Sequence, residues 1–330
     1  MHAFYSGHSL SDHVPEAVAA IAQAAGRSFD YEFQSLFGSP LRARTKGPDP
    51  SAAGFAGYRR GKNRHGEGLD VVAELRTPSR YDTLVVTERD DLPWSAFNER
   101  TPEYLTHMVT QLAAGNPDAR VFFYHVWLSI PQRAGGEPDA AAWIAYERAV
   151  LPLWECVASA ANRRLSKAGL TPRVTVLPGA TALVSLVEDL LAGRVPGAPQ
   201  GSDADRLRWL FSDNVHPTEV GIYFMGLVHY AVLFGQPPAA APAPEGISPS
   251  AAAYMQALAW KHVADYQPIA RAAAERDMGA CREYAARTTC PLFFAIDQKP
   301  GLLGDLTRIK STWRCAHDYR NVDDPQQPFR

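Results

Sequence analysis

The chain has 330 residues, of which 46% are hydrophobic and 21% charged, the composition of an ordinary soluble globular protein. Lys and Arg number 33 and Asp and Glu 35, so a net charge of -2 gives no uniform field that would attract nucleic acid or an anionic membrane. No apolar run approaches the roughly 20 residues that a membrane-spanning helix needs, which excludes an integral membrane protein.

The cysteines and the first residues bear on the compartment. The N-terminus has neither the charged start nor the apolar stretch of a secretion signal. Cys156 stands alone, whereas Cys281, Cys290 and Cys315 fall near the end of the chain and favour at least one disulfide there. Four cysteines allow three complete pairings, and four unrelated buried thiols are the alternative. We expect a periplasmic or secreted protein whose signal is absent from this sequence, with a cytoplasmic protein as the alternative.

Short apolar segments typical of strands alternate with longer helical patterns. This alternation predicts a parallel sheet with helices on both faces. The first helix is predicted where Val14, Val18 and Ile21 recur at helical spacing before Gly26. The predicted strands are residues 3–6, 29–34, 83–87, 121–126 and 174–177, and the further predicted helices are 103–114, 140–168, 180–192, 218–234 and 250–266.

Two segments lie outside this pattern. Residues 237–246, rich in Ala and Pro, are predicted to be an extended connector, and residues 267–330 an extension packed on the main domain of residues 1–266. A loop at 41–64 carries many bases against the single acid Asp49, and is either a solvated surface loop or a flap that attracts an anionic substrate. Its bases are Arg42, Arg44, Lys46, Arg59, Arg60, Lys62 and Arg64.

The sharpest local motif is Gly-His-Ser-Leu at residues 7–10, between the first predicted strand and the first helix. In an open α/β sheet, ligands bind at the carboxyl ends of the strands, and Gly7 allows a tight turn that leaves the Ser9 hydroxyl accessible. A helix cap is the alternative for such a serine. A nucleophilic serine needs an imidazole to take its proton and an acid to orient that imidazole. His216 has Asp213 three residues before it, ahead of the clearest late helix.

Together the motifs at 7–10 and 213–216 resemble those of the SGNH or GDSL hydrolase family. In that family a Gly-x-Ser near the N-terminus provides the nucleophile, and an Asp-x-x-His near the end of the domain completes the triad. The resemblance covers roughly residues 1–235. It implies a flavodoxin-like, three-layer α/β/α sandwich with five parallel strands, and a triad of Ser9, Asp213 and His216.

The resemblance also implies an oxyanion hole. Two donors would be the backbone amides of Ser9 and Gly38, with an ordinary turn glycine as the alternative for Gly38. The family's third donor, the Asn of a Gly-x-Asn-Asp motif, is missing, and residues 88–91 read Glu-Arg-Asp-Asp instead. An ionised carboxylate cannot donate a hydrogen bond, so either these acids point elsewhere or Arg89 or another donor compensates. The sequence thus resembles divergent branches of the family.

The end of the fourth strand supplies further candidates. There Trp127 is predicted to form a wall on which a sugar stacks and His125 a polar contact, with core packing as the alternative. No Cys or His cluster has metal-ligand spacing, and no glycine-rich loop fits a phosphate or a dinucleotide, so we expect no metal and no cofactor.

The sequence therefore predicts a serine esterase that removes small acyl groups, acetyl above all, from a carbohydrate through an acyl-serine. The substrate would be a small-molecule or polysaccharide ester, anionic if the 41–64 loop is a flap; the carbohydrate part follows divergent relatives by analogy. A general carboxylester hydrolase or an acyltransferase would use the same triad, and a catalytically weak carbohydrate-binding relative would explain the missing Gly-x-Asn-Asp. Neither nucleic acid nor membrane insertion is expected.

Overall fold

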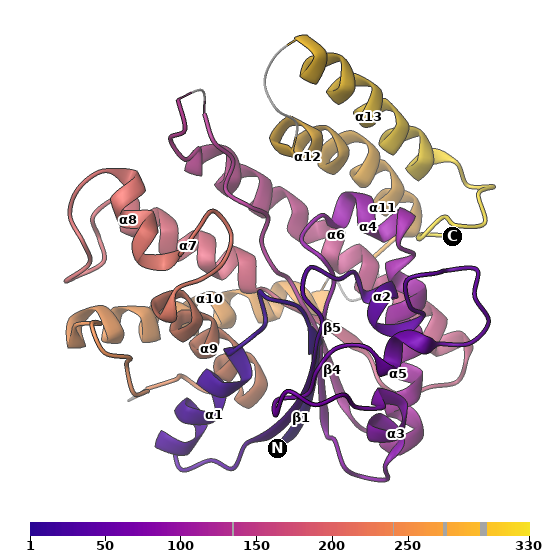
Figure 1. Cartoon of the computed structure of the whole chain (residues 1–330), viewed down its shortest axis with the longest axis horizontal. Helices are drawn as coiled ribbons and strands as arrows, with labels where there is room; N and C mark the ends of the chain where they lie inside the picture. The colour runs from indigo at the N-terminus through magenta and orange to yellow at the C-terminus, as the bar shows by residue number, and fades with distance from the viewer. Residues whose placement is uncertain (134, 240, 273–275, 298–301) are drawn as a thin grey trace.

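A five-stranded sheet forms the centre of the molecule (Figure 1). The computed structural model describes residues 1–133, 135–239, 241–272, 276–297 and 302–330. All strands are parallel, in the order β2-β1-β3-β4-β5. The predicted five-stranded parallel sheet is thus confirmed. The strands are β1 (His2–Gly7), β2 (Asp30–Ser35), β3 (Thr83–Thr87), β4 (Arg120–Tyr124) and β5 (Val174–Leu177).

Helices cover both faces of the sheet, which gives the predicted three-layer α/β/α sandwich (Figure 1). One layer contains α1 (Val14–Ala24), α7 (Gly179–Leu191), α8 (Asp203–Leu210), α9 (Glu219–Phe234) and α10 (Pro249–Ala272). The other contains α2 (Leu41–Thr45), the 3-10 turn η1 (Ala56–Arg59), α3 (Val71–Arg76), α4 (Leu92–Asn98), α5 (Thr101–Gly115) and α6 (Ala140–Lys167).

The inner strands are apolar because both of their faces are covered. Every residue of β3 is buried, and the chain there reads Thr-Leu-Val-Val-Thr, rich in the β-branched residues that suit a covered strand. The outer strand β2 instead alternates polar and aromatic residues and keeps several partly exposed. Because β1 lies between β2 and β3, the turn that follows it has a neighbouring strand on each side at the carboxyl edge of the sheet.

The predicted helices lie within a few residues of the observed ones, and their ends have local causes. Thr218 caps α9 by accepting a hydrogen bond from Gly221 N at 3.4 Å, and Gly235 ends the helix at φ 63°, a conformation that favours glycine. α10 runs to Ala272, so the predicted domain boundary at 266 falls inside this helix. Residues 240, 273–275 and 298–301, which belong to the predicted connector and extension, lie outside the described residues.

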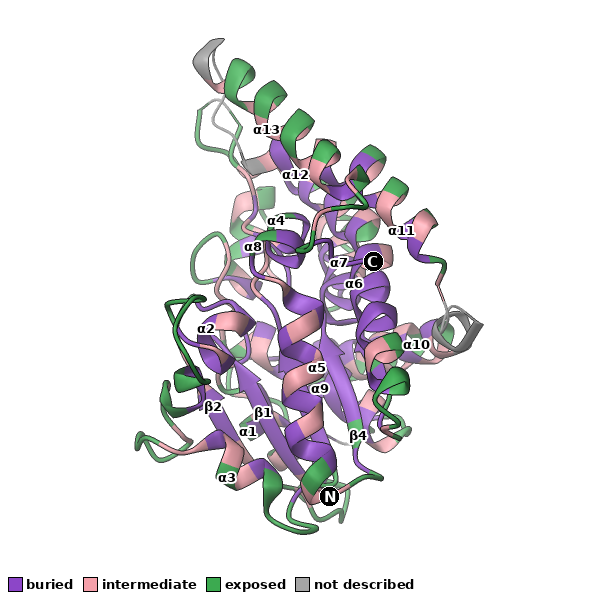
Figure 2. Cartoon of the chain, turned by 90° about the vertical axis from the view of Figure 1, so that its right-hand side faces the viewer, coloured by how far each residue is buried: buried purple, intermediate pink, exposed green. Residues whose placement is uncertain are grey.

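The C-terminal extension is helical and packs against α6 and α4. Disulfide Cys156–Cys281 connects the extension to α6. Disulfide Cys290–Cys315 connects two helices within the extension. A disulfide in this part of the chain was predicted, and the alternative of four unrelated thiols is wrong. Figure 2 shows buried residues continuing from α6 to α12, so the extension shares the main core. Its elements are α11 (Met278–Tyr284), the π-helical segment Ala285–Thr289, α12 (Cys290–Asp297) and α13 (Leu302–Arg320).

Among the described residues, no helix has the length and the apolar content that a membrane crossing requires.

Candidate active site

The turn after β1 presents Ser9 at the carboxyl edge of the sheet. Ser11 closes this turn: its Oγ donates to His8 O at 2.7 Å and accepts from His8 N at 3.0 Å. A Cβ at position 7 would lie 1.9 Å from Ser11 Oγ, so this turn requires Gly7. The residue types of the motif are therefore set by the turn itself, which leaves Ser9 partly exposed between the buried His8 and Leu10.

Ser9, His216 and Asp213 form a continuous chain of hydrogen bonds. Ser9 Oγ lies 3.0 Å from His216 Nε2, and His216 Nδ1 lies 2.7 Å from Asp213 Oδ2. Asp213 Oδ1 also accepts from the backbone N of Val215 and of His216, each at 2.7 Å. The structure thus brings the three predicted triad residues together from positions 207 residues apart in the chain. The contacts match those of a nucleophile, its base and the acid that orients the base.

The same hydrogen bonds set the charge of Asp213. Burial works to raise the pKa of this carboxyl, but the bonds donated by His216 and Val215 outweigh that effect and lower the pKa below its ordinary value. Asp213 is therefore ionised at neutral pH. An ionised carboxylate accepts a hydrogen bond from Nδ1–H, which holds the imidazole in the tautomer whose Nε2 can take the proton of Ser9.

The loop that carries His216 is held by the segment after β4. Trp127 is fully buried, and its indole Nε1 donates to Val215 O at 2.8 Å. Ile130 N donates to Asn214 O at 2.8 Å. These two bonds hold the two residues between Asp213 and His216, and thereby attach the loop to the segment that follows β4.

Two of the predicted substrate contacts are wrong. β4 ends at Tyr124, and His125 continues beside β5, where its backbone N donates to Leu177 O at 3.0 Å. Its side chain is fully buried, with Nε2 3.5 Å from Glu147 Oε2. Trp127 is buried as well and supports the loop, so neither side chain reaches a substrate. Both belong to the core-packing alternative.

Of the three acids after β3, Glu88 and Asp91 are held by hydrogen bonds and by an ion pair, respectively. Glu88 is fully buried, and its carboxylate accepts from Leu41 N at 2.9 Å, Arg89 N at 2.8 Å and Thr101 Oγ1 at 2.7 Å. The Arg89 guanidinium pairs with Asp91 and lies 5.5 Å from the centre of the Trp94 ring. Glu88 therefore does not oppose an oxyanion, and a role of Arg89 at the substrate stays a prediction.

A buried basic group lies behind the nucleophile turn. Arg44 is fully buried, and its guanidinium donates to Ser6 Oγ at 3.2 Å and to Thr87 O. His8 is also buried, with Nε2 3.1 Å from Glu88 O. Burial, reinforced by the charge of Arg44, lowers the pKa of His8 to about 3. His8 is therefore neutral and adds no positive charge beside Ser9.

The turn after β2 forms one wall of the site. Leu36 N donates to Gly7 O at 3.1 Å, which places this turn directly against the nucleophile turn. Gly38 has φ 58°, the left-handed region that favours glycine, and its amide as an oxyanion donor stays a prediction. Phe37 is 78% exposed, and its ring centre lies 6.1 Å from that of His216 with the planes 21° apart. Sequence reasoning missed Phe37, although it adjoins the predicted Gly38.

The bases of the 41–64 loop do not form one patch. Arg42 pairs with Glu99, and Arg64 pairs with Asp30 at the amino end of β2, far along the strand from Ser35. Arg44 is buried, as described above. Lys62 exchanges two backbone hydrogen bonds with Ser35 at the carboxyl end of β2, at 3.0 and 3.1 Å. Lys62 is therefore an exposed base of this loop that lies beside the carboxyl end of β2, next to the strand that carries Ser9.

Comparisons with known proteins bear on the fold alone. No family model and no curated protein matches the sequence. Among solved structures, the chain is similar to a DUF4886 family protein from Bacteroides uniformis, with a TM-score of 0.52 and 15% identity over 81% of this chain and 95% of that chain. In the described part of the chain, no three His, Cys, Asp or Glu side chains gather as metal ligands.

The Trp127 bond generates a first prediction. Trp127→Phe removes the donor to Val215 O while keeping most of the buried ring, so the loop loses its anchor. We expect kcat for a small ester to fall roughly 10- to 100-fold with little change in KM, because the base is misplaced relative to Ser9. Trp143→Phe is the matched control, because it removes a buried indole bond to Leu128 O at 2.7 Å without touching the loop. Equal losses of kcat in both variants would contradict the anchoring role.

The buried histidines generate a prediction about pH. Burial lowers the pKa of His8, His125 and His229 to about 3, whereas unfolded histidine titrates near 6.5. Between these values the unfolded chain binds more protons, so acidification favours unfolding. The raised pKa values of Glu88 and Glu147 have the opposite effect on the free energy of unfolding, but only two carboxyls oppose three imidazoles. We therefore expect the free energy of unfolding to fall as the pH is lowered from 7 to 5.

This prediction is measured by chemical denaturation at several pH values. His229→Gln should flatten the slope by about one proton, which is about 1.4 kcal/mol per pH unit. His65→Gln, at an exposed position, is the control and should leave the slope unchanged. A slope that His229→Gln does not alter would show that the buried imidazole is not what makes the fold acid-sensitive.

Proposed function

We propose that this protein is a serine esterase that removes small acyl groups, acetyl above all, from a carbohydrate. The observation that carries the proposal is the chain of hydrogen bonds from Ser9 Oγ through His216 to Asp213, at the edge of the sheet where α/β folds bind ligands. The resemblance of the two motifs to the SGNH hydrolases supports the same chemistry.

The reaction proceeds by double displacement. Ser9 Oγ attacks the acyl carbon while His216 Nε2 takes the hydroxyl proton, and Asp213 stabilises the imidazolium that forms. The tetrahedral intermediate collapses when His216 returns that proton to the leaving alkoxide, which leaves the acyl group on Ser9. Water then attacks the acyl carbon while His216 Nε2 takes one of its protons. This second tetrahedral intermediate collapses when His216 returns the proton to Ser9 Oγ, which breaks the bond between Oγ and the acyl carbon and releases the acid. Backbone amides of Ser9 and Gly38 would stabilise the oxyanion, each by roughly 3 to 4 kcal/mol.

The carbohydrate part of the proposal is supported by Phe37. An exposed aromatic ring next to the catalytic imidazole offers a flat apolar surface on which a sugar ring stacks. This surface takes the place that the sequence assigned to Trp127. The exposed Lys62 beside Ser35 would favour an anionic glycan over a neutral one.

The triad is tested by covalent labelling and by turnover of an activated acetyl ester. A fluorophosphonate should label the protein, and Ser9→Ala should abolish the labelling, whereas Ser28→Ala, at an exposed serine after α1, should not. Ser9→Ala and His216→Ala should each lower kcat by several orders of magnitude, because members of a catalytic unit act together, and Asp213→Asn should cost less. A protein that turns over no ester and does not react would be the binding relative that the missing Gly-x-Asn-Asp favours.

The role of Phe37 is tested by comparing two substrates. Phe37→Ala should lower kcat/KM for an acetylated xylo-oligosaccharide about tenfold, the value of one lost ring contact of about 1.4 kcal/mol, and should change kcat/KM for ethyl acetate little. Phe37→Tyr keeps the aromatic surface and is the control. Equal losses on both substrates would mean that Phe37 shapes the catalytic turn instead of binding the sugar.

A further inference from the structure

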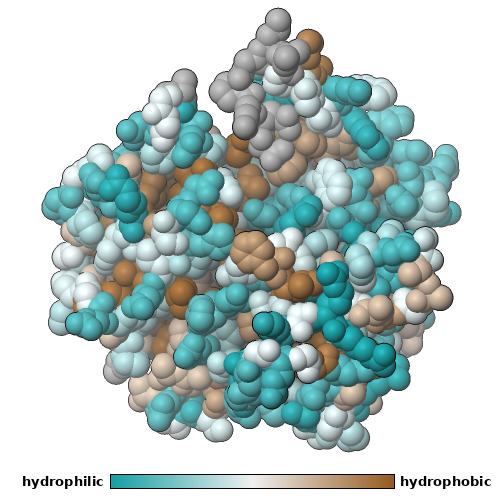
Figure 3. All heavy atoms as spheres, in the orientation of Figure 1, coloured by the Kyte–Doolittle hydropathy of each residue, from teal (hydrophilic) through white to brown (hydrophobic). Residues whose placement is uncertain are grey.

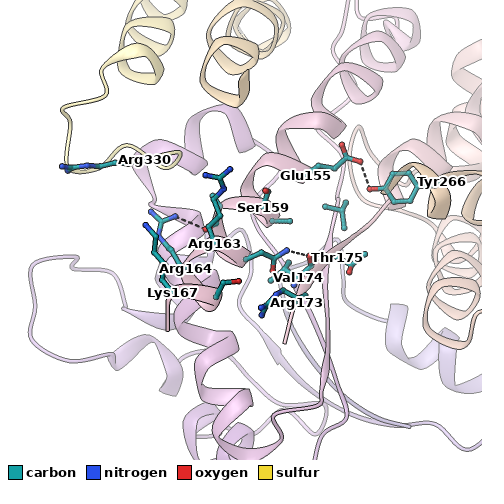
Figure 4. Close-up of a pocket in the computed structure, with 15 residues that line it drawn as sticks. Glu155, Ser159, Arg163, Arg164, Lys167, Arg173, Val174, Thr175, Tyr266 and Arg330 are labelled. Atoms are coloured by element: carbon teal, nitrogen blue, oxygen red, sulfur yellow. Dashed lines mark hydrogen bonds between the residues drawn. The ribbon is translucent and has the colours of Figure 1, made fainter. Parts of the chain in front are cut away.

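A large pocket lies at the outer edge of the sheet, away from Ser9. It has a volume of about 940 Å³ and is lined by the second half of α6, by β5 and by Tyr266 of α10 (Figure 4). α6 crosses back along the sheet after β4, so its last turn and the start of β5 lie at the amino edge of the sheet. Ser9 lies at the carboxyl edge, after β1, which two strands separate from β5. We call this hollow the β5 pocket; the lining residues that matter for its chemistry are Glu155, Arg163, Arg164, Lys167, Arg173 and Tyr266.

The β5 pocket is strongly basic. Arg163, Arg164 and Lys167 come from the last turns of α6, and Arg173 comes from the residue before β5. Among the described residues, none of these four side chains forms an ion pair with a carboxylate. The charges therefore stay available to a ligand.

The acid that lines the pocket is already engaged. Glu155 Oε1 accepts from the Tyr266 hydroxyl at 3.0 Å (Figure 4). Its Oε2 pairs with the Arg276 guanidinium. These contacts satisfy the Glu155 carboxylate at one end of the pocket. The carboxylate therefore does not neutralise the bases at the other end.

The guanidinium groups are held in place by neutral partners. Arg164 Nη1 donates to Pro328 O at 3.2 Å, and Arg163 Nη2 donates to Arg276 O at 3.3 Å. Arg173 Nη1 donates to three carbonyl oxygens of the segment just before it, at 2.6 to 3.0 Å. Carbonyls orient the guanidinium groups without cancelling their charge, so little conformational entropy is lost when an anion binds.

A second observation separates this pocket from ordinary helix capping. Basic side chains in the last turn of a helix stabilise its negative end, which accounts for Lys167 and Arg164 alone. Arg173 lies beyond the helix, six residues after Lys167, and still lines the same hollow. Burial also lowers the pKa of Arg164, with the charge of Arg100 acting in the same direction and that of Glu103 opposing it.

We propose that the β5 pocket binds an anion that carries two or more phosphate or carboxylate groups. Guanidinium groups suit this ligand because their paired donors match the oxygens of both groups. The volume lies within the range of roughly 300 to 1,000 Å³ typical of small-molecule sites. The site is separate from the triad, and its occupancy does not depend on the esterase reaction.

The test is isothermal titration of the full chain with inorganic tripolyphosphate and with trigalacturonate, at low and at physiological salt. Arg163→Gln combined with Lys167→Gln removes two exposed charges and leaves the more structural Arg164 and Arg173 in place. We expect one site per chain, a loss of affinity of about tenfold or more in this variant, and unchanged turnover of a small neutral ester. The tighter of the two probes identifies phosphate or carboxylate as the natural group.

Two further variants make the result decisive. Arg27→Gln combined with Lys310→Gln removes the same charge from exposed positions outside the pocket, and should keep the affinity. Phe37→Ala should also keep it, because this variant removes the ring proposed to bind the sugar beside the triad, and the result separates the β5 pocket from the proposed active site. The proposal is overturned if neither probe binds, or if the control variant loses as much affinity as the pocket variant, because binding would then reflect net charge alone.

Discussion

The hydrogen bond from the Trp127 indole to Val215 O is the contact on which the candidate site depends. It joins the rigid end of the sheet to a loop that carries two of the three triad residues, and it does so from a fully buried side chain. Without it, the loop would keep only the bond from Ile130 N to Asn214 O on this side, besides its own short-range bonds. A donor fixed by packing holds the loop more precisely than surface contacts would, and catalytic geometry tolerates little displacement.

A second layer stabilises the nucleophile turn from below. Arg44 and Glu88 are a buried base and a buried acid that attract each other. Each is bonded to backbone or hydroxyl groups of neighbouring elements, and of their side-chain polar atoms only Nε of the Arg44 guanidinium has no hydrogen-bond partner among the described residues. A buried charge that lost its partner would be costly, so the pair makes α2 and the segment after β3 interdependent. The unusual acid after β3, where the resemblance expects a glycine, is accounted for by this structural role.

How much the sequence could predict depended on the range of the interactions involved. The strands and the Ser9 and His216 motifs follow from local pattern, because periodicity and turn chemistry act over a few residues. The prediction that His125 and Trp127 contact the substrate is wrong because a strand pattern does not show where the chain leaves the strand. The course of the chain after Tyr124 is set by backbone hydrogen bonds of His125 with Leu177 and Ala180. Phe37 and the pairing of the cysteines were out of reach, because both depend on segments that meet only in the folded chain.

The positions of basic residues in the sequence likewise do not predict where an anion binds. The 41–64 loop has the densest run of bases in the sequence, yet folding sends Arg44 into the core and Arg64 to the far end of β2 beside Asp30. The bases of the β5 pocket are fewer than those of the loop, but they line one pocket in the folded chain. Their guanidinium groups bond to carbonyl oxygens instead of carboxylates. The local potential depends on which counter-charges lie nearby, so an excess of charge in space, and not in sequence, marks where an anion binds.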